Sequence, residues 1–423
     1  MNLRHICAAA GIAAFMVAAT ANATVHRVFP GESIQAAIDV AAPGDTILVE
    51  PGIYKNLDKT SKYGLRITTD NLRLIGKVVP GKKGDEGKVR LVYNDDGDDN
   101  DPLTGQQTGV YAAPAGCEYQ DVQGSCKKPH LKGFYIRGFT VEDFPMNGIQ
   151  TRWVDGFEFV QNESVRNLNN GIYPTLSANG LVQNNVSYGS LDTAMWVAGS
   201  ENVRVIGNDL SASTIGFEIT VSNNVWVTQN KIYDNTLGIG LFHPNGAGNP
   251  PLPEMKNWVI EHNHVRNNNR PNNAPPGSFQ SFLPPGIGIL LSGVSDHVIA
   301  KNTVTDNGFV GIGVLGWCTA NNGTPNACDT VPPPELLGDP AVNNNRIALN
   351  KVARNGLSPP PIDIAFLAAD ITYFTSTLFG EVSSGNCFEK NKPSSFTFFS
   401  ATEFAFPGGV PTPIPGPLPT DGC

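Results

Sequence analysis

The sequence predicts an all-β protein: a single-stranded right-handed parallel β-helix, or solenoid, with an N-terminal amphipathic cap helix. Three observations predict this fold. An Asn followed by a branched apolar residue recurs along the chain, a Gly-Ile dipeptide or its equivalent often follows that Asn, and a short amphipathic segment precedes the repeats. Repeats of roughly 20 to 50 residues are typical of solenoids, because one unit cannot bury its apolar face alone.

The repeated Asn defines the coil. The first separations are 22 to 24 residues, and the later, longer separations indicate the same coil with inserted loops. We expect these residues to occupy turns, because Asn tolerates left-handed backbone, and to bond through their amides to the equivalent Asn one coil away. This makes them structural rather than catalytic. The residues are Asn162, Asn184, Asn208, Asn230, Asn263, Asn302, Asn350 and Asn391, with a second set at Asn167, Asn235, Asn268, Asn307 and Asn355.

The chain is expected to divide into four parts. Residues 1–23 form a signal peptide, 24–55 the cap and first coil, 56–400 the β-helix with inserts at 267–285 and 319–343, and 401–423 a Pro-rich tail. A solenoid end needs a cover because it exposes strand edges. Residues 33–42 fit a short amphipathic helix for that purpose, with Ser33 near its start.

The first residues indicate export. Arg4 and His5 precede an apolar run from Ile6 to Ala19, and Ala21-Asn22-Ala23 is a small-x-small cleavage site, so the mature chain is expected to begin at Thr24. The apolar run is too short for a comfortable membrane span of ~20 residues, although an uncleaved anchor is the alternative. We therefore predict a secreted or periplasmic protein with no membrane span after cleavage.

Six cysteines follow the signal peptide, and an even number in an exported chain favours disulfides over free thiols. Six cysteines allow fifteen pairings. Proximity in the sequence suggests Cys117–Cys126, Cys318–Cys328 and Cys387–Cys423.

The formal net charge is −9 with the signal peptide present. A mildly acidic chain without a basic stripe is a poor nucleic-acid binder. The sequence does not define an oligomeric state.

The segment Ser33–Tyr54 and the Asn-x-Val…Gly-Ile repeats resemble the pectin-lyase-like right-handed β-helix superfamily. Within it, they are similar to parallel β-helix repeat proteins such as mannuronan epimerases and NosD-type periplasmic proteins. The resemblance covers most of residues 25–392. It implies the fold rather than an activity, because this fold hosts lyases, hydrolases, epimerases, adhesins and accessory proteins.

Three signatures of related enzymes are missing from the sequence. It has no Gly-His-Gly of the polygalacturonase type, no Arg-x-Pro-x-x-Arg of pectate lyases and no Asp-Pro-His-Asp of mannuronan epimerases.

The resemblance places a substrate groove along the sheet formed by the Gly-Ile strands, and alternation predicts which residues face outward. The expected column is Gln150, Tyr173, Trp196, Glu218, Gly240, Gly288 and Gly313. Gln150, Tyr173, Trp196 and Phe242 are candidates for sugar binding. The alternative is that the aromatic residues pack beneath inserted loops.

Four residues near this column are candidate catalytic groups. Glu218 and His243 could move protons, Arg152 could neutralise a uronate carboxylate, and Asp192 could assist. The two carboxyl groups are also the one local pair that could serve in hydrolysis, which needs a separation of ~5–10 Å.

Residues 94–101 are rich in hard oxygen ligands. Asp95, Asp96, Asp98 and Asp99 could bind Ca²⁺, although a solvated acidic turn explains them equally simply.

Two classes of function follow. The first is an exported uronate-glycan lyase or epimerase that acts on a polysaccharide. The second is a non-catalytic carbohydrate-binding or surface protein, and a NosD-like accessory role is a third possibility.

Overall fold

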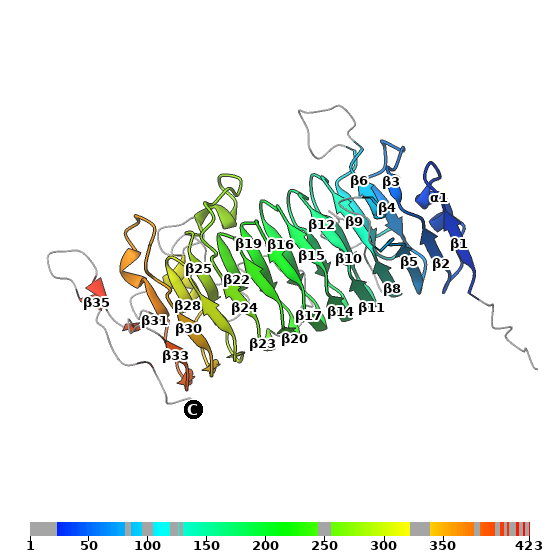
Figure 1. Cartoon of the computed structure of the whole chain (residues 1–423). Coiled ribbons are helices and arrows are strands. Elements are labelled where there is room, and N and C mark those ends of the chain that lie inside the picture. Colours follow the sequence, from blue (N-terminus) through cyan, green and yellow to red (C-terminus); the bar gives the residue numbers. More distant parts are fainter. Residues whose placement is uncertain are drawn as a thin grey trace, which may run out of the picture.

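The computed structural model describes residues 23–80, 86–94, 105–118, 126, 130–243, 255–321, 339–375, 381–393, 398–401, 404–405, 412–413, 418 and 423. The chain winds into a stack of coils along one axis, from β1 and α1 at one end to β31 and β33 towards the other (Figure 1). Strands of successive coils pair in parallel and form three long sheets, which confirms the predicted parallel β-helix.

Each sheet takes one strand from each coil. Sheet A consists of β1 (Val25–Val28), β2 (Thr46–Val49), β5 (Leu72–Gly76), β8 (Leu131–Arg137), β11 (Val154–Val160), β14 (Ala178–Gln183), β17 (Glu201–Ile206), β20 (Asn223–Thr228), β23 (Lys256–Glu261), β26 (Val298–Ala300), β29 (Arg346–Ala348) and β32 (Cys387–Glu389). Sheet B consists of β3 (Gly52–Tyr54), β6 (Val89–Val92), β9 (Phe139–Glu142), β12 (Glu163–Val165), β15 (Val186–Tyr188), β18 (Asp209–Ser211), β21 (Lys231–Tyr233), β24 (His264–Arg266), β27 (Thr303–Thr305), β30 (Lys351–Ala353) and β33 (Lys392–Pro393).

Sheet C carries the Gly-Ile strands. It consists of β4 (Tyr63–Ile67), β7 (Thr108–Ala112), β10 (Ile149–Arg152), β13 (Ile172–Thr175), β16 (Thr193–Ala198), β19 (Ile215–Thr220), β22 (Leu237–Phe242), β25 (Ile287–Ser292), β28 (Val310–Leu315), β31 (Ala369–Phe374) and β34 (Phe398–Ala401). A small antiparallel pair, β35 (Phe404–Ala405) and β36 (Thr412–Pro413), lies in the C-terminal segment.

The helix α1 (Ile34–Asp39) caps the N-terminal end, as predicted. The Ala36 backbone N–H donates to Ser33 Oγ at 3.1 Å, so Ser33 is the N-cap, and Ile34 and Ile38 are buried. The Gln35 side chain bonds both the N–H and the C=O of Arg66, at 2.8 and 3.1 Å. The cap helix thereby satisfies backbone groups of the edge strand β4.

The predicted Asn ladder exists, with one residue corrected. Asn162 Nδ2 donates to Asn185 Oδ1 at 3.1 Å, and Asn185 Nδ2 donates to Asn208 Oδ1 at 3.0 Å, so Asn185 rather than Asn184 belongs to the ladder. The left-handed residue is the one before each ladder Asn, such as Asn184 at φ 54° and Gln229 at φ 59°. The ladder Asn is therefore required for its amide bonds and not for its backbone conformation, which corrects our explanation.

The Gly of the Gly-Ile dipeptide has a packing reason. A Cβ at Gly216 would lie 2.5 Å from Ile232 Cγ2 and 2.7 Å from Asn235 Nδ2, a ladder amide. No larger side chain fits between the strand and the buried ladder.

The buried side chain of His297 occupies, in its coil, the position that Asn345 and Asn386 occupy in the next two coils. The His297 ring stacks on Trp258 with centroids 4.2 Å apart and an interplanar angle of 1°, and its Nδ1 accepts from the Trp258 backbone N–H at 3.3 Å. Asn345 and Asn386 follow in the same row of the next coils. Burial lowers the pKa of His297 to about 3, because the charged imidazolium would lose its hydration.

Two of the expected disulfides are present, Cys117–Cys126 and Cys387–Cys423. Cys318 is also disulfide-bonded, and its expected partner Cys328 lies outside the described residues, as does most of the predicted signal peptide. No helix in the described part of the chain is long and apolar enough to cross a membrane.

Candidate functional site

The outer face of sheet C presents the predicted column with one correction. The paired positions run from Gln150 to Tyr173 and from Trp196 through Glu218 and Gly240 to Leu290, followed by Gly313 and Thr372. Leu290 therefore occupies the place expected for Gly288. Gly-Ile occurs twice in succession at residues 286–289. Gly286 precedes β25 and has a φ of 99°, and Gly288 is the glycine that lies level with Gly238 of the neighbouring strand.

Two stacked aromatic rings form a platform on this face. The Tyr173 and Trp196 rings lie 4.6 Å apart between centroids with an interplanar angle of 11°, and both side chains are half-buried. Trp196 Nε1 donates to Thr220 Oγ1 at 3.0 Å, while Val197 is fully buried. Alternation thus placed Trp196 correctly on the outer face. We call Tyr173 and Trp196 the aromatic platform.

A pair of buried carboxyl groups lies beside the platform. Trp196 pairs with Glu218 on the next coil, and Glu218 and Asp192 are 4 and 8 % exposed. The Thr193 hydroxyl oxygen lies 2.7 Å from Glu218 Oε2 and 3.0 Å from Asp192 Oδ1. A hydroxyl has one proton, so Asp192 and Glu218 compete for it as acceptors. We call these two residues the carboxyl pair.

The surroundings of Asp192 and Glu218 favour the protonated forms of both carboxyl groups. Burial raises the pKa of Asp192 to about 7, against hydrogen bonds from Thr193 and Gln280 that lower it. Burial also raises the pKa of Glu218 well above its usual value, and the nearby Asp192 carboxylate raises it further. Two carboxyl groups this close ionise in separate steps, because the second negative charge must form beside the first.

The insert at 267–285 reaches this pair. Its short 3-10 helix η1 (Phe279–Phe282) brings the Gln280 side chain into a hydrogen bond with Asp192. Sequence reasoning missed both Gln280 and Thr193. Gln280 lies on an insert, outside the repeating coil, so the repeat pattern of the sequence could not identify it. Thr193 pairs with Ile215, whose equivalents Leu237 and Ile287 belong to an apolar cluster with Phe242.

The N-terminal part of the face does not present Gln150 to solvent. Gln150 is fully buried, and its Oε1 accepts from Asn147 Nδ2 at 3.0 Å, so its expected role in sugar binding is not supported by its position. Arg152 is half-buried on β10, and β13 and β16 separate its strand from β19. At ~4.8 Å per strand, three steps place its strand about 14 Å from that of Glu218.

The glycines predicted at the C-terminal end of the column suggest an uncovered surface there, but other side chains cover this part of the face. A Cβ at Gly240 would lie 2.4 Å from the Phe242 ring, so that ring covers the glycine. Phe242 is 2 % exposed and packs edge-on against Phe279 of the insert at 5.2 Å. His243 is 1 % exposed and lies beside Trp317 with ring centroids 6.0 Å apart. The structure therefore brings Asp192 and Glu218 together, and His243 and Phe242 belong to a separate apolar region.

Asp95, Asp96, Asp98 and Asp99, the candidate Ca²⁺ ligands, lie outside the described residues. Within the described ranges, no group of three or more His, Cys, Asp or Glu residues could hold a metal ion.

The protein is a right-handed parallel β-helix that carries the carboxyl pair and the aromatic platform on the outer face of sheet C. The family model described as the right-handed beta helix region matches residues 147–327. No curated protein matches the sequence.

Solved structures share the fold at low identity. The A-module of mannuronan C-5 epimerase AlgE4 from Azotobacter vinelandii has a TM-score of 0.53 and 16% identity, over 88% of this chain and 94% of that chain. DFA-IIIase from Arthrobacter chlorophenolicus A6, solved in complex with GF2, has a TM-score of 0.52 and 12% identity, over 89% of this chain and 85% of that chain. The Dettilon tailspike protein has a TM-score of 0.52 and 15% identity, over 87% of this chain and 58% of that chain. At these identities, the likeness concerns the fold.

Proposed function

We propose that this protein is an exported glycoside hydrolase, in which the aromatic platform binds a glycan and the carboxyl pair cleaves a glycosidic bond. The observation that carries the proposal is the single Thr193 hydroxyl bonded to both Asp192 and Glu218. It holds two buried carboxyl groups with raised pKa values side by side, and a pair of carboxyl groups is what glycoside hydrolysis uses.

The two carboxyl groups would divide the work by their acidity. Glu218 has its pKa raised by burial and by the neighbouring charge, so it is the general acid that gives its proton to the leaving glycosidic oxygen. The bond between that oxygen and the anomeric carbon breaks as the Asp192 carboxylate forms a bond to the carbon, because two carboxyl groups on one hydroxyl lie too close to hold a water between them. Water then attacks the anomeric carbon, gives its proton to the Glu218 carboxylate and releases Asp192 as the carboxylate. With a pKa of about 7, Asp192 is ionised above neutral pH and can act as this nucleophile.

The platform supports binding at the right place. Tyr173 and Trp196 present two stacked, half-buried rings, and sugar rings pack against such apolar faces. Trp196 pairs directly with Glu218, so a sugar on the platform lies one strand from the acid. Gln280 is hydrogen-bonded to Asp192 in this structure, so a substrate that reaches Asp192 competes with this bond.

Uronate lyase or epimerase chemistry is less well supported by this geometry. It requires a positive charge beside the reacting carboxylate, and Arg152 stands three strands from the strand of Glu218. The structural neighbours support carbohydrate chemistry in general, because their titles include a mannuronan epimerase and a DFA-IIIase in complex with DFA-III. The disulfides Cys117–Cys126 and Cys387–Cys423 support the predicted export.

A second candidate is a glycan-binding protein without turnover. The deep burial of both carboxyl groups and the Gln280 contact favour it, because buried acids also occur as structural elements.

One experiment separates the candidates. Mature protein from Thr24 onwards would be applied to a glycan array, and each bound glycan would then be assayed for new reducing ends and for unsaturated products. New reducing ends that disappear in both Glu218→Gln and Asp192→Asn support hydrolysis. Binding without any product supports the binding protein, and unsaturated products would establish lyase chemistry instead.

A further inference from the structure

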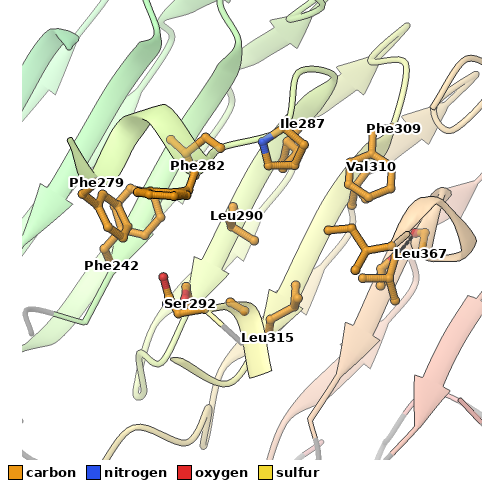
Figure 2. Close-up of a pocket in the computed structure, with 16 residues that line it drawn as sticks. Phe242, Phe279, Phe282, Ile287, Leu290, Ser292, Phe309, Val310, Leu315 and Leu367 are labelled. Atoms are coloured by element: carbon orange, nitrogen blue, oxygen red, sulfur yellow. Dashed lines mark hydrogen bonds between the residues drawn. The ribbon is translucent and has the colours of Figure 1, made fainter. Parts of the chain in front are cut away.

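An apolar pocket lies next to the carboxyl pair, on the C-terminal part of the sheet C face. Its floor is formed by β25 and β28, and its walls are η1, the short helix α2 (Trp317–Ala320) and the 3-10 helix η3 (Ala365–Leu367) (Figure 2). Its volume is about 80 Å³. Leu290 lies at the centre of the view, with Phe242, Phe279 and Phe282 grouped on one side and Phe309 on the other.

The walls on one side are flat aromatic surfaces held in place by one another. Phe279 packs edge-on against Phe242 at 5.2 Å and 80°, and it stacks on Trp317 at 5.7 Å and 7°. Rings arranged this way offer faces and edges to a further ring, which is the geometry that aromatic groups prefer.

The mouth of the pocket exposes apolar side chains. Phe282 and Ile364, which line the pocket, are each 42% exposed, and nearby Ile362 and Phe366, the latter within η3, are 39 and 37% exposed. Exposed apolar side chains gathered around a cavity mark an interaction site more often than a random surface does.

Three polar side chains line the pocket, and two of them are bonded to the backbone: Asn321 Nδ2 donates to Trp317 O and the Thr372 hydroxyl donates to Leu367 O. Ser292 is 2% exposed and lines the pocket, and its hydroxyl has no hydrogen-bond partner among the described residues. Leaving a buried hydroxyl unsatisfied is costly, so a ligand that supplies a partner would gain affinity.

We propose that this pocket binds a compact aromatic ring carrying one hydrogen-bonding oxygen, which is the chemistry of a phenol. The aromatic walls and Leu290 hold the ring, and the Ser292 hydroxyl bonds the oxygen. The inference does not depend on the proposed hydrolysis, because it concerns binding at residues that take no part in the acid–base step.

Titration calorimetry of the mature full-length chain with phenol and with toluene tests the inference. We expect saturable binding of both by the native protein. Ser292→Ala removes one oxygen atom and should weaken phenol binding about 5-fold, the worth of one neutral hydrogen bond, while toluene binding changes less than about 2-fold. Leu290→Trp should fill the pocket and weaken both at least about 10-fold.

The inference is overturned if the native protein binds neither compound saturably, or if Ser292→Ala weakens toluene as much as phenol. Should Leu290→Trp fail to fold, the Ser292→Ala comparison alone decides. Phenyl glycosides identify the source of the ring. A dissociation constant lower than that of phenol, raised again by Trp196→Ala, assigns it to a substituent on a bound sugar; an equal constant assigns it to a free phenolic molecule.

Discussion

The Tyr173 and Trp196 rings are stacked across two neighbouring coils, 4.6 Å apart between centroids. This distance is close to the ~4.8 Å spacing of adjacent strands, so the rings stack because their strands do. The bond from Trp196 Nε1 to Thr220 Oγ1, on the following strand of the sheet, holds the indole from its other side. The platform is thus set before any ligand arrives.

Replacing Trp196 by Ala should weaken glycan binding. The loss of one stacking face is worth about 0.5–1.5 kcal/mol, which is a factor of roughly 2 to 13 in the dissociation constant. Calorimetry with a glycan identified on the array measures it. Trp226→Ala is the matched control, because Trp226 is an exposed Trp on β20 of sheet A. Equal effects of the two substitutions would remove the platform from the binding site.

Glu218→Gln should reduce turnover by about 10²–10⁴-fold, the usual contribution of a positioned acid or base. The amide keeps the size of the side chain and a hydrogen bond to Thr193 but has no proton to give. Initial rates of reducing-end formation measure the loss, and glycan binding should change little. An unchanged rate would exclude Glu218 as the acid.

Asp192→Asn should stabilise the fold at alkaline pH. The folded-state pKa of Asp192, about 7, lies above its ordinary value of 3.8. The folded chain thus holds a proton that the unfolded chain releases, and its stability falls as pH rises from about 4 through 7. Asn carries no titrating proton and avoids this loss. We expect a gain in the free energy of unfolding on the order of 2–4 kcal/mol at pH 8 and little at pH 4, measured by urea denaturation. A gain that is equal at both pH values would contradict the raised pKa.

Asn208→Ala should destabilise the coil stack by roughly 3 kcal/mol. The Asn208 amide accepts from the N–H and Nδ2 of Asn185 and donates to Val182 O and Asn230 Oδ1, all in buried surroundings. Asn202→Gly is the control. Asn202 belongs to an exposed row of Asn residues at φ 55°, a conformation that Gly adopts freely, so we expect a change within about 0.5 kcal/mol. Chemical denaturation of both variants compares them, and similar losses would argue against the buried ladder as the source of stability.

His297→Asn should reduce acid sensitivity. Folded His297 stays neutral down to a pKa of about 3, whereas an unfolded His takes up a proton below about 6.5. Stability is therefore lost as pH falls from about 6.5 toward 3, with a slope approaching 1.4 kcal/mol per pH unit, about one proton. Asn fits the row that Asn345 and Asn386 continue. Thermal unfolding between pH 4 and 7 should show a flatter profile for the variant, and His262→Asn on the exposed surface is the matched control.

The fold was accessible from the sequence because its determinants are local and repeat. Each buried Asn contacts its own copy one coil away, so the period of the sequence is the period of the structure. Asn184 was misassigned because Asn184-Asn185-Val186 fits the Asn-x-Val pattern, whereas Val186 directly follows the true ladder residue, Asn185. The amide bond from Asn162, 23 residues earlier, identifies Asn185.

The candidate site was accessible only in part. Alternation placed Trp196 and Glu218 on the outer face, but it did not identify Thr193, which begins β16 and pairs with Ile215. Gln280 lies on an insert, and the length of that insert does not predict that it returns to contact Asp192. The distinction between Gly288 and Leu290 required the register of β25, which the doubled Gly-Ile obscures.

The turn η1 carries Gln280 against Asp192 and, on either side of it, Phe279 and Phe282 against the apolar pocket. One short segment thus contacts two sites, and either site can bias its position. By thermodynamic reciprocity, an occupant of the pocket that shifts the pKa of Asp192 has its own affinity changed by the same factor when Asp192 ionises.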